Sequence, residues 1–201
     1  FALRRQGNFR AAIEEYGRAL DIDPRHFKAL YNRAFSLDKL GRWAEAVQDY
    51  TRALVIDASN ANAFHNRGST YDKMGRHEDA IADFSRAIDL EPRAASSFNS
   101  RALAHDKTGA AAEALRDFSR AIDLEPHNPV FRHNRGFCYR NLGDFERAIQ
   151  DYTAAIDLDP ASAAAAHSNR GYAWRKLGQF AAAVADYTRS LELDPGNLKT
   201  L

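Results

Sequence analysis

The chain has 201 residues, and its 28 basic and 27 acidic residues nearly cancel, leaving a formal net charge of +1. This balance argues against nucleic acid as the main ligand, because phosphate binding depends on clustered lysine and arginine side chains that release counterions. No apolar run approaches the roughly 20 residues that span a bilayer, so membrane insertion is not expected.

One repeat recurs along the whole sequence. Its period is marked by Gly7, Gly41, Gly75, Gly109, Gly143 and Gly178, which lie 34 residues apart except for a last step of 35. In chain order we expect a partial repeat 1–24, five complete repeats 25–58, 59–92, 93–126, 127–160 and 161–195, and the start of a further repeat at 196–201. One extra residue therefore lies between Pro160 and Gly171. Because both ends fall inside a repeat, we expect the chain to be a segment of a longer array.

Each repeat is predicted to be a hairpin of two helices. In repeat 59–92 the second helix carries Ala80, Ile81, Phe84, Ala87 and Ile88, which form one stripe on a helix of 3.6 residues per turn. The glycine between the helices suits a left-handed cap. Asp-Pro or Glu-Pro ends the second helix in most repeats, because the residue before proline avoids helical geometry. Such hairpins bury their apolar faces only against their neighbours.

The motif of this repeat is that of a known family. Repeat 59–92 carries Phe64, Gly68, Tyr71, Ala80, Phe84 and Pro92. This arrangement resembles the tetratricopeptide repeat (TPR) family, with its pattern W-x2-L-G-x2-Y…A-x3-F…P, and the resemblance covers the whole chain. It implies an all-α, right-handed α-solenoid of antiparallel helix hairpins. It also implies a protein–protein interaction scaffold or adaptor that binds an extended peptide or a partner helix in its concave groove.

Two other functions remain open. The chain could be the substrate-recognition segment of a larger enzyme, with catalysis encoded outside these residues. It could also be a structural element of a large cytoskeletal or ciliary assembly, contacted on its outer surfaces. Neither catalysis by this chain nor a bound cofactor is expected. Fold-level analogy does not identify the partner.

Asparagine recurs at the sixth position of the first helix. The residues are Asn32, Asn66, Asn134 and Asn169, and repeat 93–126 has Ser100 there. This spacing resembles the asparagine ladder in the superhelix of the O-linked N-acetylglucosamine transferase. A carboxamide both donates and accepts hydrogen bonds, so it can pair with a peptide unit whatever its side chain. The alternative is that asparagine at this position is only family consensus.

A charged stripe lies further along the same helices. Its members are Asp38, Asp72 and Asp106 in the earlier repeats, Arg140 and Arg175 in the later ones, and beside them Lys39, Lys73, Lys107 and Lys176. The stripe is thus mixed in charge at first and basic toward the C-terminus. We expect the four asparagines, the three aspartates, Arg140, Arg175 and Lys176 to bind peptide. An acidic stretch in the ligand would gain on-rate and orientation here. The alternative is a solvated helix face.

An arginine and an aspartate recur together 16 residues apart. The arginines are Arg33, Arg67, Arg101, Arg135 and Arg170, and the aspartates are Asp49, Asp83, Asp117, Asp151 and Asp186. The constant offset predicts ion pairs between packed helices; the alternative is pairing within the second helix, for example Asp49 with Arg52. Either way the role is structural. An exposed pair contributes ~0–1 kcal/mol, so Arg67→Leu is expected to have little effect on stability and Arg67→Glu a clear one.

Other candidate sites are not supported by the sequence. The fifth and ninth positions lack the lysine and asparagine with which heat-shock co-chaperones clamp a carboxylate, so these repeats carry no such clamp. No two of the seven histidines lie four residues apart on one helix, and no metal site is expected. Cys138 is the only cysteine, so no internal disulfide can form. An intracellular, most simply cytoplasmic, location is expected, with a cytoskeletal or ciliary assembly as an alternative.

Overall fold

The computed structural model describes residues 7–196. Residues 1–6 of the expected partial repeat, and the further repeat from residue 197 onward, lie outside this range. The described residues form eleven α-helices and no strand. They divide into two compact units, Phe1–Thr108 and Gly109–Leu201, called here the N-terminal and the C-terminal unit. The boundary between the two units lies inside repeat 93–126.

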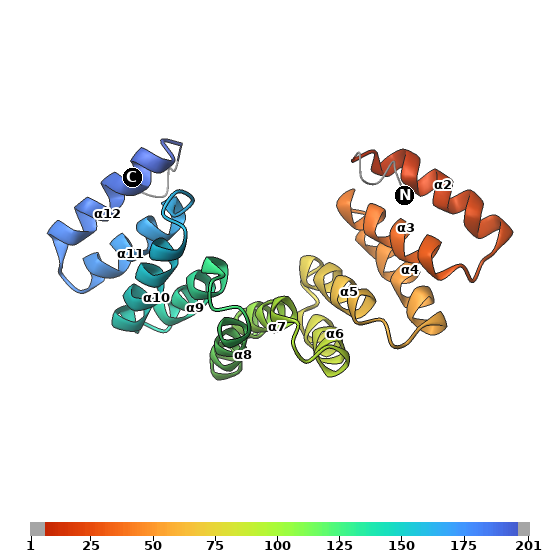
Figure 1. Ribbon diagram of the computed structural model, residues 1–201, viewed down its shortest axis with the longest axis horizontal. Helices are drawn as coiled ribbons and strands as arrows, with labels where there is room; N and C mark the ends of the chain where they lie inside the picture. Colours follow the sequence, from red (N-terminus) through yellow and green to blue (C-terminus); the bar gives the residue numbers. More distant parts are fainter. Residues whose placement is uncertain (1–6, 197–201) are drawn as a thin grey trace. The chain divides into compact units, whose positions relative to one another are not determined.

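The described part of the N-terminal unit contains six helices. They are α2 (Phe9–Ile22), α3 (Phe27–Lys39), α4 (Trp43–Ile56), α5 (Ala61–Lys73), α6 (His77–Leu90) and α7 (Ala95–Lys107). Consecutive helices pack against each other, so that α3 with α4 and α5 with α6 form hairpins (Figure 1). The first helix of a repeat also contacts the first helix of the next, α3 with α5 and α5 with α7. These first helices therefore share one surface.

Up to residue 196, the C-terminal unit contains five helices. They are α8 (Ala111–Leu124), α9 (Pro129–Asn141), α10 (Phe145–Leu158), α11 (Ala164–Lys176) and α12 (Phe180–Leu193). Here α9 with α10 and α11 with α12 form the hairpins, and the two first helices, α9 and α11, touch (Figure 1). In both units we call the surface carried by the first helices the first-helix surface.

The turn inside each hairpin depends on its glycine. All six period-marking glycines have positive φ, between 74° and 81°. At Gly41 the amide donates to the Asp38 carbonyl (3.0 Å), and the Arg42 amide donates to the Leu37 carbonyl (2.9 Å). A residue with a Cβ is strained in this left-handed conformation. The expected left-handed cap is confirmed.

The second helices end in extended backbone. Asp23, Glu91, Glu125 and Asp159 have φ between −129° and −145°, and each precedes a proline. Asp57 has the same geometry (φ −135°) although Ala58 follows it. There the Asp57 carboxylate accepts hydrogen bonds from the Ser59 hydroxyl (2.6 Å) and amide (3.0 Å), and these bonds lower its pKa. The Asp23 carboxylate accepts the same kind of bond from the Arg25 amide (3.0 Å), so this side-chain turn forms with or without proline.

Small residues let the two helices of a hairpin approach closely. Ala80 on α6 is fully buried, and Gly68 on α5 lies against the same helix. A Cβ added to Gly68 would lie 3.0 Å from Phe84 Cε1, and one added to Gly171 would lie 2.9 Å from Tyr187 Cε1. The large buried rings therefore occupy the space that glycine leaves, as expected for a close-packed interior.

Four of the predicted arginine–aspartate pairs join the two helices of a hairpin. They are Arg33–Asp49, Arg67–Asp83, Arg135–Asp151 and Arg170–Asp186, each held by two N–H···O bonds of 2.6–2.9 Å. The fifth pair, Arg101 and Asp117, belongs to different units. Pairing between helices is confirmed. Pairing within one helix occurs in addition at Asp49, whose Oδ1 lies 3.5 Å from Arg52 Nη1, whereas Arg86 and Arg189 pair with Asp89 and Glu192.

Candidate functional site

The ten predicted peptide-binding residues all lie on first helices. In the N-terminal unit, α3 carries Asn32 and Asp38, α5 carries Asn66 and Asp72, and α7 carries Asp106. In the C-terminal unit, α9 carries Asn134 and Arg140, and α11 carries Asn169, Arg175 and Lys176. The structure therefore places them on one kind of surface, and their contacts differ between the two units.

In the N-terminal unit the charged stripe is neutralised by ion pairs between neighbouring first helices. Lys73 Nζ lies 2.5 Å from Asp38 Oδ2, and the side chain of Asp38 is only 9% exposed. Lys107 Nζ lies 2.6 Å from Asp72 Oδ2. Asp106, the third acid, has no ion pair or hydrogen bond within the described part of this unit. Two of the three aspartates are therefore already paired within the protein.

The asparagine carboxamides are largely occupied by contacts between and within helices. Asn66 Nδ2 donates to the Tyr31 hydroxyl (2.7 Å), and Asn32 Nδ2 donates to the Lys28 carbonyl (2.7 Å). Asn169 uses both ends of its amide, as described below. Asn134 is half-buried at the same position of α9. Asn66 and Asn169 therefore tie neighbouring repeats together through amide groups that a ladder of peptide-binding side chains would leave free.

In the C-terminal unit three basic side chains surround one tyrosine. Arg140 Cζ and Arg175 Cζ each lie 5.3 Å from the centre of the Tyr172 ring, and Lys176 Nζ lies 5.6 Å from it. None of the three forms an ion pair with an acidic side chain in the described residues of this unit. We call these four residues the Tyr172 cluster. Its charge, unlike that of the N-terminal stripe, is uncompensated.

An exposed aromatic ring extends the Tyr172 cluster along α9. Arg140 Cζ lies 4.1 Å from the centre of the Phe137 ring, and Phe137 is 39% exposed. At the equivalent place in the next hairpin, Tyr172 packs against Phe145, which begins α10. Helix α8 begins with Ala111, which has no ring to cover Phe137. Stacked arginine, exposed ring and unpaired charge together form a surface on which an anionic chain can lie.

A hydrogen-bonded chain connects Arg140 to a histidine. Arg140 Nη1 donates to Asn169 Oδ1 (2.7 Å), so the other end of the amide, Asn169 Nδ2, faces His133 Nε2 at 2.9 Å. An amide nitrogen can only donate, so His133 must accept at Nε2 and carry its hydrogen on Nδ1. Burial lowers the pKa of His133, and the nearby Arg140 charge lowers it further. The neutral ring is thus the favoured form.

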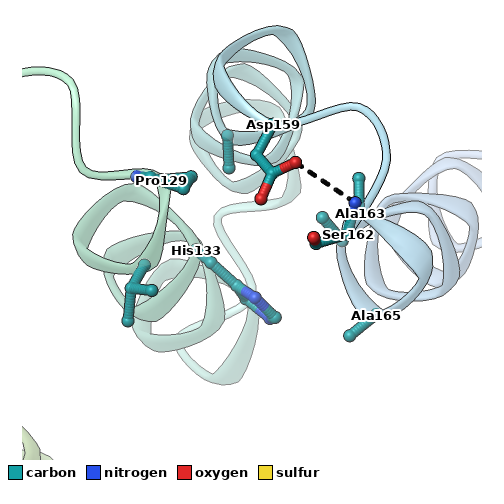
Figure 2. Close-up of a pocket in the computed structure, with 9 residues that line it drawn as sticks. Pro129, His133, Asp159, Ser162, Ala163 and Ala165 are labelled. Carbon is teal, nitrogen blue, oxygen red and sulfur yellow. Dashed lines mark hydrogen bonds between the residues drawn. The ribbon is translucent and has the colours of Figure 1, made fainter.

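His133 lines a pocket between the first turns of α9 and α11, with a volume of about 120 Å³. Figure 2 shows its ring directed from α9 toward α11, with the Asp159 carboxylate on the opposite side. Asp159 Oδ1 accepts a hydrogen bond from the Ser162 amide (3.2 Å), which closes the loop before α11. The loop contains the extra residue of the last complete repeat, and the helix that follows presents Ala165 and Ala166 to the pocket.

Three features of these surfaces were missed from the sequence. In the repeated arginine–aspartate pairs, each arginine after Arg33 also donates to a hydroxyl on the second helix of the preceding repeat. These hydroxyls belong to Thr51, Ser85, Ser119 and Thr153. This signal was present as a recurring serine or threonine. Tyr172 was missed although its neighbours were predicted. The only sequence feature that indicated the pocket was the extra residue in an alanine-rich run.

The described residues contain neither a metal-binding cluster nor a membrane-spanning helix. Across residues 7–196, no three His, Cys, Asp or Glu side chains are grouped closely enough to hold a metal ion. None of the helices in the described part of the chain combines the length and apolar character that crossing a bilayer requires.

Solved structures with the same fold extend over almost the whole chain. PilW, described as a widely conserved type IV pilus biogenesis factor, has a TM-score of 0.89 and 18% identity, covering 99% of this chain and 92% of its own. PilF of Pseudomonas aeruginosa has a TM-score of 0.82 and 20% identity over 99% and 90%. YrrB, described as a TPR protein with an unusual peptide-binding site, has a TM-score of 0.72 and 21% identity over 94% and 96%. At these identities the likeness concerns the fold, and it confirms an all-α solenoid of helix hairpins.

The sequence comparisons identify the family. No curated protein matches the chain. Two profiles, both described as the tetratricopeptide repeat, match residues 2–62 and residues 61–93, 130–162 and 164–197. The matched residues make up most of the chain, and the hairpins within them have the glycine turns and close helix contacts described above. The chain therefore belongs to the tetratricopeptide repeat family.

Proposed function

We propose that this chain is a protein-interaction scaffold whose first-helix surface binds an extended acidic peptide, with the Tyr172 cluster as the main contact. The observation that carries this proposal is the uncompensated charge of Arg140, Arg175 and Lys176 around one ring. At the same positions in the N-terminal unit, acidic and basic side chains cancel each other. YrrB, which has the same fold, is described as binding peptide.

The geometry favours anionic side chains over neutral ones. Arginine presents a planar fork of donors that matches a carboxylate, and the ring of Tyr172 holds these donors near one another. Arg175 and Lys176 are exposed, so their attraction for a ligand acts through solvent and weakens with salt. We therefore expect binding that is specific for acidic peptides and falls as ionic strength rises.

The asparagines contribute to binding mainly by holding neighbouring side chains and helices in place. Asn169 holds Arg140 and His133 at fixed distances, and Asn66 links α5 to α3. A variant with all four asparagines changed to alanine would lose these interhelical bonds along with any peptide contact. Substitution of the cationic residues is the cleaner test.

The test measures binding of a labelled synthetic peptide by fluorescence anisotropy. The peptide is a run of glutamates in a glycine–serine host, compared with the same peptide carrying glutamines. The variant changes Arg140, Arg175 and Lys176 to glutamine. The control changes Arg116, Arg120 and Arg147 to glutamine, which removes the same charge from exposed positions on α8 and α10. Circular dichroism confirms that both variants remain folded.

The wild-type chain is expected to prefer the glutamate peptide. The cluster variant should lose this preference by about tenfold or more, because charge-assisted hydrogen bonds contribute about 1.5–3 kcal/mol each before solvent screening. The control variant should bind within about twofold to threefold of wild type. A glutamate preference that survives in the cluster variant would move the function away from this surface.

A further inference from the structure

The pocket beside His133 has a largely apolar wall. Its apolar lining includes Val130, Ala155, Ala163 and Ala166. An apolar cavity of about 150 Å³ holds a molecule the size of benzene. A pocket of about 120 Å³ therefore accepts an aliphatic side chain of the size of valine or leucine, and it is too small for an indole ring.

Hydrogen bonds link this pocket to the Tyr172 cluster. His133 lies on its wall, and Asn169 links the His133 ring to the guanidinium of Arg140, which stacks on Tyr172. All of these residues lie on α9 and α11 of the C-terminal unit, so their relative positions come from one packed helix pair. A chain lying on the Tyr172 cluster and running toward the first turns of α9 and α11 would pass over the pocket.

The spacing of the two sites can be estimated from helix geometry. His133 and Arg140 are seven residues apart on α9, which corresponds to roughly 10 Å along the helix axis. An extended peptide rises about 3.3 Å per residue. A side chain over the pocket and an acidic group at the cluster are thus separated by about three residues of peptide.

We propose that the peptide bound at the Tyr172 cluster carries an aliphatic side chain about three residues from its acidic group, and that this side chain occupies the pocket beside His133. This inference rests on the proposed function and adds an apolar determinant to it. The neutral His133 ring contributes its Nδ1–H as a donor for a peptide carbonyl. The sequence motif recognised is therefore mixed, one apolar anchor and one acidic group, rather than a run of acids alone.

The experiment uses the glutamate peptide with one leucine added, placed at a series of spacings on either side of the acidic residues. Each peptide is compared with its leucine-to-glycine counterpart on the whole chain. The protein variant Ala165→Phe fills the pocket from an exposed position of α11. The control Ala185→Phe adds the same ring at an exposed position of α12, away from the pocket.

Leucine at a spacing of about three residues should tighten binding roughly tenfold, the effect of burying one aliphatic side chain. This gain should vanish in Ala165→Phe and persist in Ala185→Phe. Should Ala165→Phe fail to fold, Ser162→Leu, on the exposed loop beside the pocket, replaces it.

The two proposals fail in different ways. A leucine gain that is absent at every spacing, or that is the same in the pocket variant, overturns the anchor pocket while the glutamate preference remains. Loss of the glutamate preference in wild type overturns the proposed function itself. As a direct readout, the methyl NMR chemical shifts of Ala163 and Ala166 should change on titration with the leucine peptide. They should stay unchanged with the glycine peptide.

Discussion

Replacing Arg67 with leucine is expected to destabilise the hairpin of α5 and α6. The structure changes the expectation from sequence, which gave Arg67→Leu little effect on stability. The side chain of Asp83 is only 7% exposed, and Arg67, 16% exposed, holds both of its oxygens through bonds of 2.7 Å. Leucine in place of Arg67 would leave this buried carboxylate without a partner.

The size of the effect follows from this burial. Removing one partner of a buried ion pair costs about 3–5 kcal/mol. Because water still reaches part of the Arg67 side chain, the lower end applies, about 3 kcal/mol for Arg67→Leu. Arg67→Glu should cost more, since it sets a second carboxylate against the first. The double variant Arg67→Leu/Asp83→Leu replaces the pair with apolar groups and should lie within about 1 kcal/mol of wild type.

The assay is a double-mutant cycle with urea unfolding followed by far-UV circular dichroism. Repeat arrays can unfold in stages, so amide hydrogen exchange in α5 and α6 supplies the local free energy of opening. Asp83→Leu completes the cycle. If the double variant were as unstable as Arg67→Leu alone, lost packing rather than an unpaired charge would be the cause. A change below about 0.5 kcal/mol for Arg67→Leu would contradict the burial of the pair.

Two further predictions concern other buried groups. The Tyr152 hydroxyl is buried and has no hydrogen-bond partner among the described residues. Phe84 and Phe118 occupy the same position in other repeats, so Tyr152→Phe should raise the free energy of unfolding, measured by urea titration, by about 1 kcal/mol. A loss of stability would show that the hydroxyl has a partner. Burial lowers the pKa of His65 and His133 below the 6.5 of the unfolded chain. Below pH 6.5 the unfolded state then binds more protons, so stability should fall as pH drops from 6.5 toward the lowered values, and His65→Gln/His133→Gln should flatten this dependence.

Much of the fold could be predicted from the sequence because the interactions that define one hairpin are local. The glycine turns require a left-handed residue, and the Arg67–Asp83 pair lies 16 residues apart inside one repeat. A constant spacing in the sequence therefore translates directly into a constant contact. The charged stripe could also be located, because helix periodicity assigns residues to a face.

Whether the charges of the stripe are paired depends on contacts between neighbouring repeats, which the sequence did not predict. Lys73 reaches Asp38 and Lys107 reaches Asp72 across 35 residues, whereas Arg140, Arg175 and Lys176 meet around Tyr172 without an acid. Asn169 and Asn66 are likewise occupied by the neighbouring helix. Periodicity predicts the face on which a residue lies, and it does not predict which side chain of the next helix will reach it.

The sequence by itself thus determined the repeat, its hairpin turns and its internal ion pairs. Only the tertiary structure decided that Asp38 and Asp72 are paired in the N-terminal unit while the Tyr172 cluster has no acidic partner among the described residues, and that a pocket opens beside His133. The physical reason is that these features arise where two helices from different repeats pack. There, the loop between Pro160 and Gly171 that contains the extra residue, and the alanines that follow it, line the pocket.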